Sequence, residues 1–180
     1  MSNTIYTQFE FESEFKSNQT YFFDNNIWIS LCSPINNNPK KQRKVSNFLS
    51  KIENYSSQIA LVSLVISEFT NTTIRFYFNL WKDRTQNYGA DYKRDYKPTT
   101  DFQDKLTEVK SLVRFIYQLD IVEKYPDSFN AIALDPIMEN FHIDFNDAYY
   151  LELCARNNWI LVTSDNDFDS IDKGITIVKI

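Results

Sequence analysis

Short apolar runs that alternate with longer stretches of helical periodicity constrain the fold of this chain most strongly. Between the runs, apolar residues recur every three or four positions, which is the spacing of one helix face. Strands that alternate with helices in this way pair in parallel, so the sequence predicts an α/β fold with a mostly parallel central sheet. The runs expected to form buried strands are Tyr21–Phe23, Gln58–Val62, Trp159–Val162 and Ile175–Val178.

The chain has 180 residues, which fits a single domain. Residues 1–19 are polar and are expected to form a mobile or loosely packed N-terminal segment, followed by one domain over 20–180 with a helical insertion around 71–130. Residues 83–100 are expected to form an insertion or a mobile loop within it, and residues 123–130 a loop around a proline. Helices are expected over 25–31, 40–52, 63–81, 102–119, 131–139 and 144–156.

The composition excludes several kinds of functional site. Two glycines in the whole chain are too few for a glycine-rich phosphate loop. A single histidine, His142, argues against most zinc sites and against a serine or cysteine nucleophile activated by histidine. Both cysteines, Cys32 and Cys154, lie among apolar residues and are expected to be buried free thiols. Carboxylates are therefore the expected agents of any catalysis.

Charge and hydropathy bear on partners and location. The net charge of −5 argues against the broad basic surface of an ordinary nucleic-acid binder, although a carboxylate metal site carries negative charge of its own. No apolar stretch approaches the roughly 20 residues of a membrane span. The N-terminal residues show no secretory pattern, so a cytoplasmic location is expected.

Acidic residues stand where the predicted strands end. Asp24 and Asp165 follow strands directly, and Glu68 lies about one helical turn beyond another. Because sites on parallel sheets form at the carboxyl ends of strands, these acids are expected to converge. Oxygen ligands of this kind suit Mg²⁺, and two such cations can clamp a phosphodiester during cleavage.

Each acid also has a plainer interpretation. Asp24 fits a helix N-cap, and Glu68 fits a solvated helix charge. Asp144 and Asp147 fit a variant capping box, with Asp144 as the N-cap. Residues 163–167 fit an ordinary polar turn. The argument for a site therefore rests on the acids jointly.

Three segments resemble the PIN-domain family. Phe22–Ile29 resembles the family's opening strand, aspartate and helix, and Leu64–Phe69 resembles its second, glutamate-bearing motif. Asp147–Phe168 resembles its C-terminal half, in which an aspartate opens a helix that leads through a turn and a strand to a Thr-x-Asp-x-Asp-Phe ending. The resemblance covers about residues 20–70 and 130–180, and the stretch between them matches poorly.

The resemblance implies a three-layer α/β/α sandwich and cleavage of RNA that depends on Mg²⁺ or Mn²⁺. It implies that Asp24 and Glu68 are metal ligands and that Asp147 and Asp165 are ligands or water-orienting acids. Asp167 and Thr163 match accessory positions, and Asp167 joins the expected metal set. Bacterial members are often toxins that pair with an antitoxin protein and form homodimers, but the extra length in residues 71–130 departs from compact toxins.

Two other functions remain open. The first is a non-catalytic PIN-like module that binds RNA or protein. The second is a phosphatase of haloacid-dehalogenase type, which is disfavoured because the position two residues after the strand-end aspartate is Asn26. If RNA is the ligand, either the basic helix around Lys40–Lys51 or the Tyr/Lys/Arg stretch at 88–97 is expected to guide it.

Overall fold

The computed structural model describes residues 2–180. Its centre is a six-stranded sheet in the order β1-β6-β5-β2-β3-β4, and every pairing is parallel. The expected α/β fold with a parallel sheet is confirmed. The strands are β1 (Thr4–Thr7), β2 (Thr20–Phe23), β3 (Gln58–Leu61), β4 (Val122–Lys124), β5 (Ile160–Thr163) and β6 (Thr176–Lys179).

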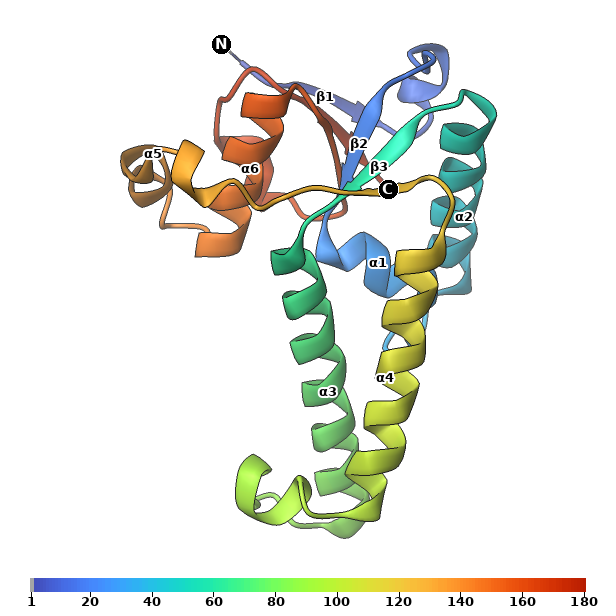
Figure 1. Cartoon of the computed structure of the whole chain (residues 1–180), viewed down its shortest axis with the longest axis vertical. Helices are drawn as coiled ribbons and strands as arrows, with labels where there is room; N and C mark the ends of the chain where they lie inside the picture. The colour runs from blue at the N-terminus through green and yellow to red at the C-terminus, as the bar shows by residue number, and fades with distance from the viewer. Residues whose placement is uncertain (1) are drawn as a thin grey trace.

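Helices connect the strands and cover the sheet (Figure 1). The α-helices are α1 (Asn25–Cys32), α2 (Pro39–Asn54), α3 (Ser63–Thr85), α4 (Thr100–Gln118), α5 (Leu134–Glu139) and α6 (Phe145–Asn157). Shorter turns are η1 (Glu10–Ser13), η2 (Tyr92–Tyr96), η3 (Phe129–Ala131) and η4 (Asp167–Ser170). None of the helices within residues 2–180 combines the length and the apolar character needed to cross a bilayer.

The alternation of side chains along β2 explains how the sheet packs against a helical layer on each of its two faces. Tyr21 and Phe23 face α2, where both rings pack near the ring of Phe48. Phe22 points the opposite way and packs against Tyr150 of α6, with the ring centroids 5.0 Å apart. Because successive strand residues point to opposite faces, one strand joins two helical layers. All three β2 aromatic residues are fully buried, so β2 lies at the centre of the core.

The N-terminal segment is more ordered than expected. Thr4–Thr7 pairs with β6 at the edge of the sheet, and Phe11 and Phe15 are buried. The expectation that residues 1–19 are loosely packed was wrong for the part of this segment that the structure describes. Its aromatic side chains pack against Tyr21 and against Phe48, and Phe48 is far away in sequence, so no local pattern revealed that contact.

Helices α3 and α4 form a long hairpin that projects away from the sheet (Figure 1). At its tip, the predicted loop instead contains the turn η2, in which Tyr96 is fully buried against Phe78, Trp81 and Phe102. The expectation of a mobile loop over 83–100 was therefore wrong for η2. These four aromatic side chains form a small hydrophobic core at the tip of the hairpin.

Two other boundaries differ from the expectation. Residues 122–124 form strand β4, although 123–130 was expected to be a loop. Only Val122 of this strand is buried, so no alternation of polar and apolar residues revealed it. The helix expected over 131–139 begins only at Leu134, because Phe129–Ala131 forms a separate 3-10 turn.

Candidate acidic active site

Asp24 follows β2 directly and is buried, with only 4% of its surface exposed. It occupies the N-cap position of α1, yet its side chain makes no capping hydrogen bond. Its carboxylate instead accepts hydrogen bonds from Thr163 Oγ1 at 2.7 Å and from Asn26 Nδ2 at 2.5 Å. Burial raises the pKa of Asp24 to about 6, against the lowering effect of the Thr163 hydrogen bond and with a further rise from Glu68. The Asp24 side chain is therefore held in place by Thr163 and Asn26 and does not cap α1.

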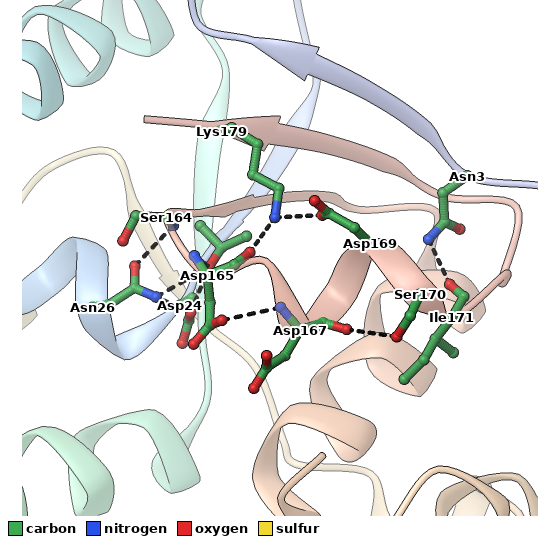
Figure 2. Close-up of polar contacts among 11 residues, drawn as sticks. Asn3, Asp24, Asn26, Ser164, Asp165, Asp167, Asp169, Ser170, Ile171 and Lys179 are labelled. Atoms are coloured by element: carbon green, nitrogen blue, oxygen red, sulfur yellow. Dashed lines mark hydrogen bonds and ion pairs between the residues drawn. The ribbon is translucent and has the colours of Figure 1, made fainter. Parts of the chain in front are cut away.

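Asp165 lies beside Asp24, just beyond the end of β5 (Figure 2). Its amide donates to Thr163 Oγ1 at 3.0 Å, and its Oδ1 accepts from the Asp167 amide at 3.0 Å. Its carbonyl oxygen accepts a hydrogen bond from Lys179 of β6. Residues 163–167 thus form the local polar turn that the sequence allows, and the turn still presents Asp165 next to Asp24.

Glu68 reaches the same place from α3. Its carboxylate accepts hydrogen bonds from Tyr150 Oη at 2.8 Å, Asn25 Nδ2 at 3.0 Å and Asn146 Nδ2 at 3.3 Å. Burial and the neighbouring Glu68 raise the pKa of Tyr150, so the phenol keeps its proton and remains a donor. Glu68 is consequently a fixed residue of the site and not a freely solvated helix charge.

Asp147 enters from the first turn of α6. Asp144 caps this helix by accepting from the amides of Asn146 at 2.7 Å and Asp147 at 3.2 Å, as expected for an N-cap. The Asp147 carboxylate accepts no hydrogen bond from residues 2–180. Burial, followed by the charges of Asp24, Asp144, Glu68 and Asp165, raises the pKa of Asp147 to about 8. Five carboxylates thus act on one another within a small region.

A cavity of about 500 Å³ joins these residues. Asp24, Glu68, Asp147 and Asp165 all line it, so the four acids expected from sequence come together. Asp167 is exposed and is not among the lining residues. Sequence reasoning missed much of the wall, which is rich in asparagine and contains one lysine. The other lining residues are Asn25, Asn26, Ile29, Ser30, Ile35, Asn36, Asn37, Asn38, Lys41 and Asp144.

The residues present fit a hard divalent cation in their chemistry. Across residues 2–180, no three His, Cys, Asp or Glu side chains form a ready-made metal-binding group. The donors are nevertheless oxygen atoms, which Mg²⁺ and Mn²⁺ prefer. Asn25 Oδ1 is buried in the cavity wall without a hydrogen-bond partner. Burial and, after it, the crowded negative charges raise the pKa of Asp147, and a cation would offset those charges.

Lys41 is the cation at the rim of this cavity. Its Nζ donates a hydrogen bond to Ser164 Oγ at 2.7 Å, and the Ser164 amide donates to Asn26 Oδ1 at 3.1 Å. Burial lowers the pKa of Lys41, and the charge of Asp24 opposes that effect. The signal in sequence was its place in the basic helix, but nothing there indicated that this lysine turns toward the cavity.

Comparison with solved structures shows the fold. VapBC2 from Rickettsia felis, bound to a DNA fragment from its promoter, is similar over 89% of this chain and 98% of the other chain, with a TM-score of 0.54 and 17% identity. PAE2754 from Pyrobaculum aerophilum is similar over 88% of this chain and 83% of the other, with a TM-score of 0.47 and 16% identity. Comparison with curated proteins found no significant match.

The PIN domain family model matches residues 21–174. This range begins in β2, ends just before β6 and contains all five acids that line the cavity. The match spans most of the chain, and the parallel α/β fold agrees with it. The chain therefore belongs to the PIN domain family.

Proposed function

We propose that this protein is a metal-dependent endoribonuclease that hydrolyses RNA phosphodiester bonds at the acidic cavity. The observation that carries the proposal is the meeting of five carboxylates from four separate parts of the chain around one cavity of about 500 Å³. Such a concentration of acids opposes folding because like charges repel. Its presence therefore favours a functional site at this cavity. Membership of the PIN domain family supports nuclease chemistry.

The carboxylates have different roles in this proposal. Asp24, Glu68 and Asp165 would hold Mg²⁺ or Mn²⁺, and Asp167 would assist from outside the cavity wall. A bound divalent cation supplies a Lewis acid and lowers the pKa of a coordinated water. A cation that offsets the neighbouring negative charges would lower the raised pKa of Asp147 and leave its carboxylate ionised. Asp147 would then take the proton from the attacking water. The new P–O bond forms as the bond to the leaving oxygen breaks.

Cleavage of a labelled single-stranded RNA panel in Mg²⁺, Mn²⁺ or EDTA tests the proposal. We expect cutting by the wild type with metal, and a loss of about a hundredfold or more in Asp24→Asn and Asp165→Asn. Asp104→Asn is the matched control, because Asp104 is exposed on α4 and does not line the cavity. Circular dichroism confirms that each variant is folded. Equal activity of Asp24→Asn and wild type, or cutting that persists in EDTA, rejects the proposal.

A non-catalytic RNA- or protein-binding module is the second candidate. It is favoured by Glu68, whose carboxylate already accepts hydrogen bonds from three side chains, and by the lack of a ready-made three-residue metal group within residues 2–180. In that case RNA would bind without being cut in any metal. The same panel, read by both gel and anisotropy, separates the two functions.

The proposed biological setting is a cytoplasmic toxin that pairs with an antitoxin protein and forms a homodimer. Support comes from the family and from the similarity to VapBC2, whose structure includes a DNA fragment from the VapBC2 promoter. We further propose that the α3–α4 hairpin is an insertion into a single domain over residues 20–180, to whose sheet the N-terminal strand β1 is added at the edge. Co-expression with the product of a neighbouring small gene, followed by co-purification, tests the pairing.

A further inference from the structure

Lys41 is set apart from the other cations of α2 by its position on the helix. It lies one turn before Val45, which is fully buried, so its side chain starts on the inner face of α2. This direction takes Nζ to Ser164, directly before Asp165. Within residues 2–180, Lys41 is the one cationic side chain that lines the acidic cavity. A positive charge is therefore held at the cavity edge.

Lys40 and Arg43 continue this positive charge on the outside of the helix. Both are exposed, and both line a surface hollow of about 570 Å³ together with Pro39, Gln42 and Ser46. Neither forms an ion pair with any residue between 2 and 180. In a protein of net charge −5, a group of unpaired cations beside an acidic cavity is a local reversal of the overall charge.

The other basic segment, at the hairpin tip, is engaged in its own structure. Arg94 pairs with Asp95 at 2.9 Å, and Lys97 lies over the ring of Tyr92 at 5.6 Å. Tyr96 is fully buried, so its ring is not free to stack on a base. The tip also lies at the end of the hairpin farthest from the sheet (Figure 1). Of the two basic segments, α2 is the one that borders the cavity.

We propose that Lys40, Lys41 and Arg43 bind successive phosphates of a single RNA strand and lead that strand into the acidic cavity. The three cations fall within about one helical turn, a rise of roughly 5 Å, so they fit neighbouring phosphates of one strand better than both strands of a duplex. Their charge would offset the repulsion between the backbone phosphates and the carboxylates of the cavity. This inference rests on the proposed function, because it takes RNA as the substrate.

We call Lys40, Lys41 and Arg43 the phosphate track. Fluorescence anisotropy with a labelled oligouridine tests whether the track binds RNA, and it is measured in EDTA so that no metal-dependent hydrolysis occurs. The test variant is Lys40→Glu/Arg43→Glu, and the matched control is Lys93→Glu/Lys97→Glu at the hairpin tip, which changes the net charge equally. We expect the Kd to rise about tenfold or more for the test variant and to stay within about twofold for the control. The slope of log K against log salt should fall by about 1.4 as two phosphate contacts are lost.

Two results overturn the inference. One is an equal loss of affinity in both variants, which would indicate a general effect of net charge. The other is unchanged RNA affinity in Lys40→Glu/Arg43→Glu, and in that case binding of an acidic protein partner to this face becomes the explanation for the cations. Neutral Lys40→Gln/Arg43→Gln should also weaken binding, which separates lost contacts from introduced repulsion.

Cleavage assays keep this inference distinct from the proposed function. If the wild type binds RNA through α2 but cuts none in Mg²⁺ or Mn²⁺, the track stands and the nuclease proposal fails. If the wild type cuts and Lys40→Glu/Arg43→Glu cuts with an unchanged KM, the nuclease stands and the track fails. If the wild type binds no RNA, both fail.

Discussion

Thr163 Oγ1 donates a buried hydrogen bond of 2.7 Å to Asp24 Oδ2, which joins the end of β5 to the start of α1. The same hydroxyl accepts from Asn26 Nδ2 at 3.1 Å and from the Asp165 amide at 3.0 Å. The Thr163 hydroxyl oxygen therefore forms hydrogen bonds with three residues of the cavity wall, Asp24, Asn26 and Asp165. Thr163 therefore acts on the site by positioning Asp24 and Asp165.

Replacing Thr163 with valine keeps the shape of the side chain but removes its hydroxyl. The change takes a donor from Asp24 and an acceptor from two N–H groups, so we expect a loss of about 1–3 kcal/mol in the free energy of unfolding. Urea denaturation measures the change. Thr163→Ser keeps the hydroxyl and should retain most of the stability. A valine variant as stable as the wild type would show that the hydroxyl contributes little.

Stability of the metal-free protein should fall as pH rises because of Asp147. Its pKa is raised from 3.8 to about 8 in the folded chain, so between these values the folded state holds a proton that the unfolded state has released. Stability from this group is therefore greatest at low pH and declines across that window. Asp147→Asn should flatten the profile and gain about 1 kcal/mol near pH 8, a value discounted for partial solvent exposure.

Urea unfolding in EDTA at several pH values between about 5 and 8 checks this prediction for Asp147. Asp104→Asn, which removes an exposed charge from α4, should leave the slope of stability against pH unchanged. If Asp147→Asn keeps the wild-type slope, other groups dominate the pH dependence. Added Mg²⁺ should stabilise the wild type more than Asp147→Asn, because a cation offsets the repulsion that the carboxylate experiences.

Lys41 should affect substrate binding more than the chemical step. Its Nζ is held by Ser164 at the cavity rim, where it faces the incoming phosphate in the proposed arrangement. We expect Lys41→Gln to raise KM about tenfold with a smaller change in kcat, since the charge acts on bound RNA throughout the reaction. Lys41→Arg should recover most of the affinity. An unchanged KM with a lowered kcat would instead place Lys41 among the groups that act only in the transition state.

The N-terminal segment should contribute strongly to stability. Phe11 is 1% exposed and packs against the rings of Tyr6, Phe15 and Tyr21. Phe11→Ala should therefore destabilise the protein by about 3–5 kcal/mol. Phe9→Ala is the matched control, because Phe9 is 85% exposed and its removal should change stability by less than about 0.5 kcal/mol. Equal effects of the two changes would contradict the packing described for η1.

The meeting of the four acids followed from sequence because a parallel sheet brings the carboxyl ends of its strands to one edge. Asp24 and Asp165 end neighbouring strands, β2 and β5, so their proximity is a consequence of strand order. Their individual roles in catalysis stay predictions. The hydrogen bonds that hold Glu68 come from α1 and α6, and no pattern within one segment encodes them.

Features that depend on how elements dock were not predictable. Lys41 carries the same charge as its neighbours, and only the packing of α2 onto the sheet turns it toward Ser164. Phe11 and Phe15 stand among polar residues, and their burial depends on Phe48, which is remote in sequence. Tyr96 falls in the segment expected to form a loop, and its burial depends on α3 and α4 closing around it.

The strand order also determines when during synthesis the site becomes complete. Strand β5 inserts between β2 and β6, and the Asp24 amide donates to the Val162 carbonyl at 3.1 Å. A growing polypeptide that has not reached residue 160 contains Asp24, Glu68 and Asp147 but lacks both Asp165 and the strand that holds Asp24. A translation product interrupted before residue 160 therefore has an incomplete acidic cavity. Under the proposed function, such a product would not cut the messenger on which the ribosome is still building it.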